Sequence, residues 1–193
     1  MSVIFKIKNK KKFFGYESVL NVAQALEILP GLEQFNFDEN DPEFNKQKFY
    51  SFKIPKDGYL FLGIRGVSGR GFELRYDAES KSYEIRILTP SAKSDWETGL
   101  EYISNLALRL GSSITADINE EIYDSQSVLK FDYQKDILFG LKGIQSELAN
   151  SDEESINEGL IRAFAINSKM IDEILSSSDP VAKFSKLMVE SQC

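Results

Sequence analysis

Residues 72–88, "FELRYDAESKSYEIRIL", carry the strongest structural signal in the sequence. Apolar and charged residues alternate on both sides of the polar turn 77–82, and this period of two is typical of half-buried strands. If residues 72–76 pair antiparallel with residues 83–87, one face of the hairpin is wholly apolar and the other sets glutamate opposite arginine. The sequence therefore predicts an antiparallel sheet built from hairpins, with one face buried.

Two further hairpins are expected on the N-terminal side of this one. Residues 3–8, "VIFKIK", alternate in the same way, and we expect residues 16–20 to return antiparallel after the lysine-rich turn "NKKKFFG". Residues 49–65 predict the other hairpin, because "PKDG" suits a tight reversal between two apolar runs. The polar and acidic residues 33–48 between them are expected to form a surface loop.

Helix starts are marked at two places in the first two thirds of the chain. Asn21 and Gln24 have the spacing of a capping box, and a short helix is expected to follow them. "SDWE", residues 94–97, has the same pattern before an apolar stripe that ends at Gly111, which predicts a longer helix with a glycine C-cap. A short strand is expected over residues 113–118.

From about residue 134 the pattern is helical. A first helix is expected to bury one face, made of Ile137, Leu138, Leu141, Ile144 and Leu148. "SDEE", residues 151–154, predicts the start of a second helix, whose stripe consists of Ile156, Leu160, Phe164, Ile171 and Ile174. Asp179 and Pro180 are expected to begin a third helix, as N-cap and first-turn proline.

These elements together predict an α+β fold, in which an antiparallel, hairpin-built sheet packs against amphipathic helices and the C-terminal region is helical. A length of 193 residues suits a single domain over residues 1–193. The pattern also allows a division into a sheet-rich part, residues 1–132, and a helical part, residues 133–193.

Composition limits the chemistry. The chain contains no histidine and a single cysteine, Cys193, which excludes histidine-dependent triads, histidine zinc sites and disulfides within the chain. A formal net charge of −7 disfavours binding of nucleic acid by the body of the protein. Residues 1–14 lack the apolar core of a signal peptide, and no apolar run is long enough to span a membrane. We therefore expect a cytoplasmic protein without a cofactor and without membrane association.

Five lysines among residues 1–12 stand out against this acidic background. A solvated hairpin turn is the ordinary interpretation of such a charge cluster. Contact with a phosphate or with an acidic partner is the alternative.

Residues 63–71, "GIRGVSGRG", contain four closely spaced glycines. The segment is not a Walker loop, because the required lysine-serine or lysine-threonine pair is missing. Its glycine spacing does not match a dinucleotide fingerprint. A nucleophile elbow is excluded as well, because the chain has no histidine to act as its partner. We expect a bend or bulge between two strands that glycine permits. The alternative is an anion site in which backbone N–H groups and two arginines act together, formed by Arg65, Gly66, Ser68, Gly69, Arg70 and Gly71.

An acidic segment, "ADINEEIYD" at residues 116–124, is a candidate metal site. If it stays extended, Asp117, Asn119 and Glu121 point to one side, and their oxygens suit Mg²⁺ or Ca²⁺. A solvated strand end is the alternative interpretation.

The C-terminal helix carries a short apolar stripe, formed by Val181, Phe184, Leu187 and Met188. This stripe is expected either to fold back on the protein's own core or to dock into another protein or a second copy of the chain.

The opening "MSVIFKIKNKKKFFGYESVLNVAQALEIL", residues 1–29, resembles the start of an uncharacterised family of cytoplasmic proteins from Firmicutes, known only as a domain of unknown function. The resemblance implies a bacterial, cytoplasmic origin and implies no activity.

We therefore expect a non-enzymatic cytoplasmic protein that works by binding another protein or by self-association. The alternative is an enzyme or small anionic-ligand binder, Mg²⁺-dependent in one version, that uses carboxylates and arginines. Its site would combine Asp117, Glu120 or Glu121 with Arg65 or Arg70.

Overall fold

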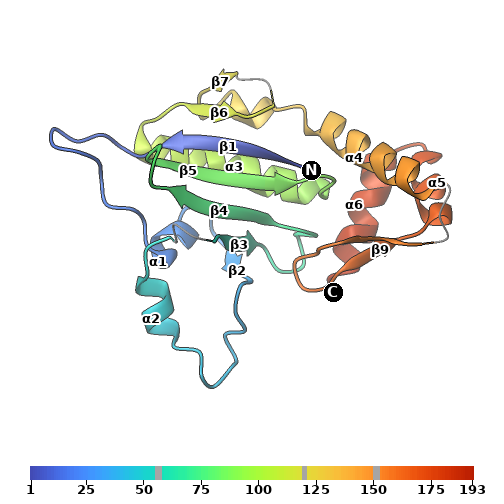
Figure 1. Cartoon of the computed structure of the whole chain (residues 1–193), viewed down its shortest axis with the longest axis horizontal. Helices are drawn as coiled ribbons and strands as arrows, with labels where there is room; N and C mark the ends of the chain where they lie inside the picture. The colour runs from blue at the N-terminus through green and yellow to red at the C-terminus, as the bar shows by residue number, and fades with distance from the viewer. Residues whose placement is uncertain (55–57, 119–120, 150–152) are drawn as a thin grey trace.

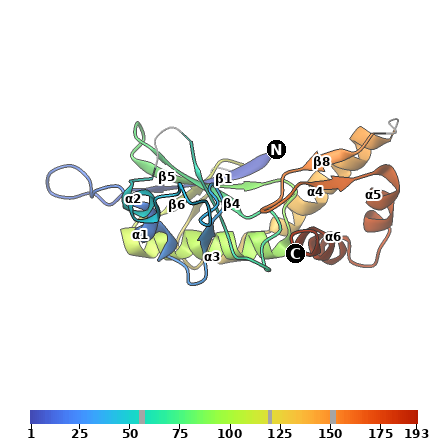
Figure 2. The same cartoon turned by 90° about the horizontal axis from the view of Figure 1, so that it is seen from below.

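An antiparallel sheet with a long helix along one face forms the centre of the molecule, as the computed structural model shows for residues 1–54, 58–118, 121–149 and 153–193 (Figure 1 and Figure 2). Within these residues, seven strands follow the order β2-β3-β4-β5-β1-β6-β7, and α3 contacts β1 and β5. The strands are β1 (Ser2–Lys8), β2 (Glu33–Gln34), β3 (Leu60–Gly63), β4 (Phe72–Asp77), β5 (Ser82–Leu88), β6 (Ile114–Ala116) and β7 (Ile122–Tyr123).

Three of the helices gather at one end of this sheet. There α4, α5 and α6 contact one another beside a small hairpin, β8 (Ser155–Asn157) and β9 (Phe164–Ile166) (Figure 1). The helices are α1 (Val22–Leu26), α2 (Lys46–Ser51), α3 (Lys93–Leu110), α4 (Tyr133–Leu148), α5 (Ser168–Leu175) and α6 (Pro180–Glu190), with a 3-10 turn η1 (Val128–Lys130) before α4. This arrangement is the α+β fold, with a C-terminal helical region, that the sequence predicts.

The hairpin predicted from residues 72–88 is confirmed by β4 and β5. Leu74 pairs with Ile85 and Tyr76 with Tyr83, and these four side chains are buried beneath the sheet. On the opposite face the same register brings glutamate and arginine together, as the alternation of the sequence predicts.

The prediction that the first strand pairs with residues 16–20 is wrong. β1 pairs with β5 over its whole length, and its other edge pairs with β6. Residues 16–20 form no strand, and an isolated bridge between Lys11 and Tyr16 closes the turn instead. The ladder with β5 joins seven residue pairs and buries one apolar face of β1, so it is favoured over a shorter local return.

The hairpin expected over residues 49–65 is wrong in its first arm. That arm begins in α2, and β3 pairs with β4 and β2 instead. Phe49 packs its ring against Phe37 and Phe44, and this aromatic contact cannot be predicted from alternation alone. Pro55 and Asp57 of the expected turn lie outside the described residues.

The helix expected from residue 151 is wrong in its first half. The chain there forms β8 and β9, and the helix α5 begins only afterwards. Ile156, which the helical spacing places on the buried stripe, is 73% exposed. The backbone turns back tightly at Gly159, where a Cβ atom would lie 2.2 Å from the carbonyl oxygen of Arg162. Two short strands joined by residues 158–163 therefore replace the first half of the helix.

Two predicted helix starts are confirmed by their hydrogen bonds, and one predicted helix end is confirmed by its backbone conformation. The Asn21 side chain accepts from the N–H of Gln24 at 2.8 Å, and the Gln24 side chain accepts from the N–H of Asn21 at 3.0 Å. Gly111 ends α3 with a φ of 62°, in the left-handed region that favours glycine. The Asp179 side chain accepts from the N–H of Ala182 at 2.9 Å, at the start of α6.

The hydrophobic core is continuous from the sheet to the C-terminal helices. The predicted stripe of α3 is buried against the sheet, with Trp96, Leu100, Ile103, Ala107 and Leu110 at most 3% exposed. The stripe of α4 is buried as predicted through Ile137, Leu141, Ile144 and Leu148, while Leu138 is partly buried.

Helix α3 begins two residues before the capping box predicted at residues 94–97. Ala92 is the N-cap, so Asp95 occupies the third helical position. An alanine side chain cannot accept a hydrogen bond from the helix. Only the other half of a capping box is therefore formed, in which the Asp95 carboxylate accepts from the N–H of Ala92 at 2.9 Å.

The carboxylate of Asp95 also holds the glycine-rich loop. Its Oδ1 accepts from the N–H groups of Gly69 at 2.9 Å and Gly71 at 2.8 Å, and its Oδ2 accepts from the N–H of Arg70 at 2.9 Å. The side chain is completely buried, and this burial raises the pKa of Asp95 to about 6, although the four N–H donors act to lower it. At pH 7 the carboxylate is therefore mostly ionised. We call this carboxylate and its four N–H donors the Asp95 clamp.

The clamped loop is joined in turn to the C-terminal part of the chain. Nε of Arg70 donates to the carbonyl oxygen of Glu158 at 2.7 Å, and Nη1 donates to that of Pro90 at 2.8 Å. The N–H of Leu160 donates to the carbonyl oxygen of Gly69 at 2.9 Å. One loop therefore connects the sheet, the start of α3 and the C-terminal hairpin.

Replacing Asp95 by asparagine tests the Asp95 clamp. An amide has one acceptor oxygen, so two of the four buried N–H groups would face a second donor, and each unsatisfied group costs roughly 1–3 kcal/mol. We expect Asp95→Asn to lower the free energy of unfolding by at least about 2 kcal/mol, measured by urea denaturation.

The matched control is Asp132→Asn at the exposed N-cap of α4. There the carboxylate pairs with the exposed Lys135, and we expect a loss below about 0.5 kcal/mol. Equal stability of Asp95→Asn and the unmodified protein would contradict the role of the clamp.

Candidate functional site

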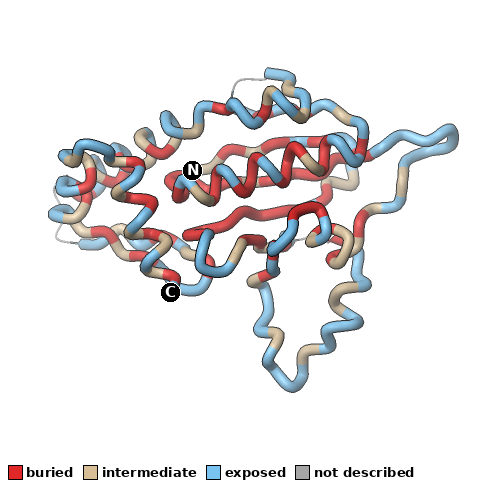
Figure 3. Tube along the Cα trace, turned by 180° about the vertical axis from the view of Figure 1, so that it is seen from behind, coloured by how far each residue is buried: buried red, intermediate tan, exposed pale blue. Residues whose placement is uncertain are grey.

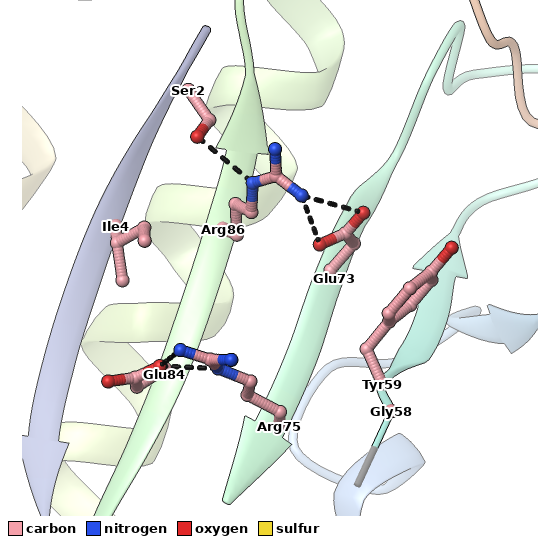
Figure 4. Close-up of a pocket in the computed structure, with 8 residues that line it drawn as sticks. All are labelled: Ser2, Ile4, Gly58, Tyr59, Glu73, Arg75, Glu84 and Arg86. Carbon is pink, nitrogen blue, oxygen red and sulfur yellow. Dashed lines mark hydrogen bonds and ion pairs between the residues drawn. The ribbon is translucent and has the colours of Figure 1, made fainter. Parts of the chain in front are cut away.

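The face of the sheet opposite α3 carries a charged cavity. It encloses about 380 Å³ and lies on strands β1, β4 and β5, next to the segment that leads into β3 (Figure 4). Its lining consists of Ser2, Ile4, Gly58, Tyr59, Glu73, Arg75, Glu84 and Arg86. We call this surface, together with the neighbouring Lys6, the charged sheet face.

Two carboxylates form the floor of the charged sheet face. Nη1 of Arg86 lies 3.1 Å from the carboxylate of Glu73. Arg75 forms an ion pair with Glu84, and Nζ of Lys6 lies 2.8 Å from the other oxygen of that carboxylate. The Glu84 side chain is only 3% exposed, whereas the three cationic side chains are each about half exposed. The surface that meets the solvent is therefore cationic.

The strand register is the reason why these charges meet. Glu73 stands opposite Arg86 and Arg75 opposite Glu84 on β4 and β5, while Lys6 of β1 stands opposite Glu84. Alternation of side chains across a strand then places all five on the same face. The pairs hold the guanidinium groups in place, because each arginine is fixed by a carboxylate that is largely withdrawn from water.

Several hydrogen-bond donors on this face have no partner among the described residues. Arg86 uses Nε for the hydroxyl of Ser2 and Nη1 for Glu73, which leaves Nη2 uncommitted. Arg75 uses Nε and Nη2 for Glu84, which leaves Nη1. The Tyr59 hydroxyl also lacks a described partner.

The charge and the protonation state of this face decide which ligands it could hold. Three cations face two carboxylates, so the cluster carries one net positive charge. Burial, and then the negative charges of Glu73 and Glu158, raise the pKa of Tyr59, so its hydroxyl is a proton donor at neutral pH. Free donors around a cavity with a net positive charge are suited to bind a carboxylate or a phosphate.

The alternation of residues 72–88 predicts the glutamate–arginine pairs of this face, but nothing in the sequence marks the face as a site. The missing signal is the position of Tyr59, which lies beside β4 and β5 only after β3 has paired with β4.

The predicted anion site in the glycine-rich loop already holds an anion, which is Asp95 of the same chain. The N–H groups of Gly69, Arg70 and Gly71 all donate to that carboxylate, so an external anion would have to displace a buried side chain. The loop is therefore the bend between two strands that the sequence predicts.

The remaining residues of that predicted site are dispersed. The Ser68 hydroxyl is buried and accepts from the N–H of Ile64 at 3.1 Å. Arg65 points to the surface, where it pairs with Glu33 and lies over the ring of Phe35. Gly66 is exposed and has a φ of 74°.

The proposed metal ligands are only partly described. Oδ1 of Asp117 accepts from the N–H of Ile4 at 2.9 Å, and a Glu121 oxygen accepts from the hydroxyl of Tyr123 at 2.6 Å. Asn119 and its neighbour, residue 120, lie outside the described residues. Over the described part of the chain, no three acidic or cysteine side chains converge as a metal site. The metal site stays a prediction.

The apolar stripe of the C-terminal helix folds back on the core. Val181, Phe184 and Met188 are at most 7% exposed, and Leu187 packs against the same core with partial exposure. The structure therefore agrees with the interpretation in which this stripe folds back on the protein's own core.

The structure is that of an α+β protein with a charged cavity on the open face of its sheet. The chain belongs to the family described as a domain of unknown function, DUF4299, whose model matches residues 2–193. The resemblance of residues 1–29 to an uncharacterised domain family is thereby confirmed and extends over nearly the whole chain. Comparison with curated proteins and with solved structures gave no match.

None of the helices in the described residues combines the length and the apolar character needed to cross a bilayer.

Two glycines of the loop provide a test of its role. Gly71 has a φ of 64°, and a Cβ there would lie 2.2 Å from the carbonyl oxygen of Leu62, whereas a Cβ at Gly66 would meet nothing within 4 Å. We expect Gly66→Ala to cost about 1 kcal/mol for its left-handed backbone alone. Gly71→Ala should cost about 2–4 kcal/mol, because steric overlap is added. Chemical denaturation of both variants measures the difference, and equal losses would contradict the close approach at Gly71.

Proposed function

We propose that the protein is a non-enzymatic, cytoplasmic protein-interaction protein whose charged sheet face receives an acidic segment of its partner. The observation that carries the proposal is the set of uncommitted donors, from Arg75, Arg86 and Tyr59, around a cavity on a cluster with one net positive charge.

Preorganisation supports binding on this face. Glu73 and Glu84 hold the guanidinium groups of Arg86 and Arg75 before any ligand arrives, so less side-chain entropy is lost on binding. A ligand carboxylate would then form charge-assisted hydrogen bonds, which are roughly twice as strong as neutral ones.

The charge of the whole chain argues for short-range recognition. A net charge of −7 opposes the long-range approach of an acidic ligand, whereas the cations on the sheet face attract it only at close distance. We therefore propose selection by fit and hydrogen bonding, with little electrostatic steering.

A free small anion is the second candidate ligand. The volume of about 380 Å³ lies within the range of about 300–1,000 Å³ found for small-molecule pockets. The enzyme that combines acidic residues with Arg70 has less support, because Arg70 is buried and donates to two backbone carbonyl groups.

Side-chain NMR of the arginines tests the proposed function. We expect hexaglutamate to shift the Nε–Hε signals of Arg75 and Arg86 in ¹⁵N-labelled protein, and hexaglutamine to leave them unchanged. Tyr59→Phe should weaken hexaglutamate binding about tenfold or more, because it removes a hydrogen bond to a charged group. The same variant should keep its denaturation midpoint, since the hydroxyl has no partner among the described residues.

Inorganic phosphate distinguishes the two candidates. If phosphate shifts the same signals at the same concentration as hexaglutamate, the small-anion candidate replaces the protein segment. If neither probe shifts them at millimolar concentration, the charged sheet face is no anion receptor and the proposal is wrong.

A further inference from the structure

A hairpin turn at residues 9–17, which we call the lysine finger, projects far beyond the sheet (Figure 1). Its base is fixed, because the N–H of Asn9 donates to the carbonyl oxygen of Lys81 at 2.8 Å. Two further backbone hydrogen bonds cross the finger, from Glu17 to Lys10 and from Lys12 to Gly15. The finger is therefore an ordered projection.

The apex of the lysine finger is apolar. Phe13 is 94% exposed and Phe14 is 88% exposed, and their rings meet edge to face with centroids 4.8 Å apart. The exposed Lys10, Lys11 and Lys12 precede them. Two adjacent phenylalanines held in water on an ordered projection indicate a surface that a partner covers.

A second projection, residues 37–52, carries the opposite combination, and we call it the aromatic lobe (Figure 3). A cleft of about 370 Å³ opens on it, lined by Phe37, Phe44, Phe49 and Phe52. The lining also includes Asp38, Asp41 and Glu43, with Lys48 as its single cation. The rim of this apolar cleft is therefore acidic.

The aromatic lobe is held in shape by Glu39. Its carboxylate pairs with Lys46 at 2.7 Å and accepts hydrogen bonds from the Tyr50 hydroxyl and from Gln34. Burial alone would raise the pKa of Glu39, but these contacts lower it to about 2. The ionised carboxylate therefore orders the lobe at neutral pH.

We propose that the lysine finger of one copy docks on the aromatic lobe of a second copy of this chain. The phenylalanines of the apex fit an aromatic cleft, and the lysines beside them meet the acidic rim. Finger and lobe project in different directions from the same molecule (Figure 1 and Figure 3). The lobe that a finger covers therefore belongs to another copy.

This self-association uses neither the charged sheet face nor the Asp95 clamp. It stands independently of the proposed function, because the finger and the lobe share no residue with the cavity on the sheet.

Charge reversal on the two surfaces tests the proposal by analytical ultracentrifugation of the full chain. We expect the unmodified protein to self-associate, with an affinity that falls as salt rises. The finger variant Lys10→Glu/Lys11→Glu/Lys12→Glu and the lobe variant Asp38→Lys/Asp41→Lys/Glu43→Lys should each be monomeric. An equimolar mixture of the two variants should associate again, because each finger then meets a lobe of opposite charge. Recovery in the mixture also shows that both variants are folded.

Two further variants separate charge from apolar contact. Phe13→Ser/Phe14→Ser should weaken association at least about tenfold without lowering the denaturation midpoint, because both rings are exposed. The matched charge control is Lys135→Glu/Lys169→Glu/Lys186→Glu, which reverses three exposed lysines elsewhere and should leave association intact.

Three outcomes would overturn the proposal. The first is an unmodified protein that stays monomeric at several hundred micromolar, and the second is a variant mixture that stays monomeric. The third is a monomer that binds phosphatidylserine vesicles through Phe13 and Phe14, which would assign the finger to a lipid surface.

Discussion

A single buried carboxylate connects the parts of this molecule. Asp95 accepts hydrogen bonds from four backbone N–H groups, three in the glycine-rich loop and one at the start of α3. Without it, these four donors would be buried without an acceptor, at a cost large relative to the stability of a domain. The Asp95 clamp holds the loop that leads into β4 against the start of α3, next to the hairpin that carries Arg75 and Arg86.

The parts of the fold that depend on local pattern could be predicted from the sequence. The alternation in residues 72–88 determines a hairpin and its register, and Asn21, Gly111 and Asp179 mark helix ends through contacts a few residues away. The choice of partner for β1 could not be predicted, because the distant β5 offers a longer ladder than a local return over residues 16–20 would. The prediction of a helix from residue 151 fails for a related reason. The apolar residues that recur there at helical spacing lie on two paired strands and on the segment that turns back at Gly159.

The candidate sites show the same division. Sequence reasoning recognises that the glycines permit a bend and that N–H groups in such a bend suit an anion. It cannot show that the anion is Asp95, which lies 24 residues beyond Gly71 and acts in a helix cap. The charged sheet face escapes prediction as a site because Tyr59 joins it only through strand pairing. The exposure of Phe13 and Phe14 is equally invisible in composition, where aromatic residues are ordinarily assigned to a core.

Native-state hydrogen exchange tests the central role of the Asp95 clamp most directly. The amides of Gly69, Arg70 and Gly71 lie in a loop, yet each donates to a buried carboxylate. We expect these three amides to exchange as slowly as the paired amides of β4 and β5, while the exposed Gly66 of the same loop exchanges fast. Exchange of these three amides at the rate of Gly66 would contradict the role of the clamp.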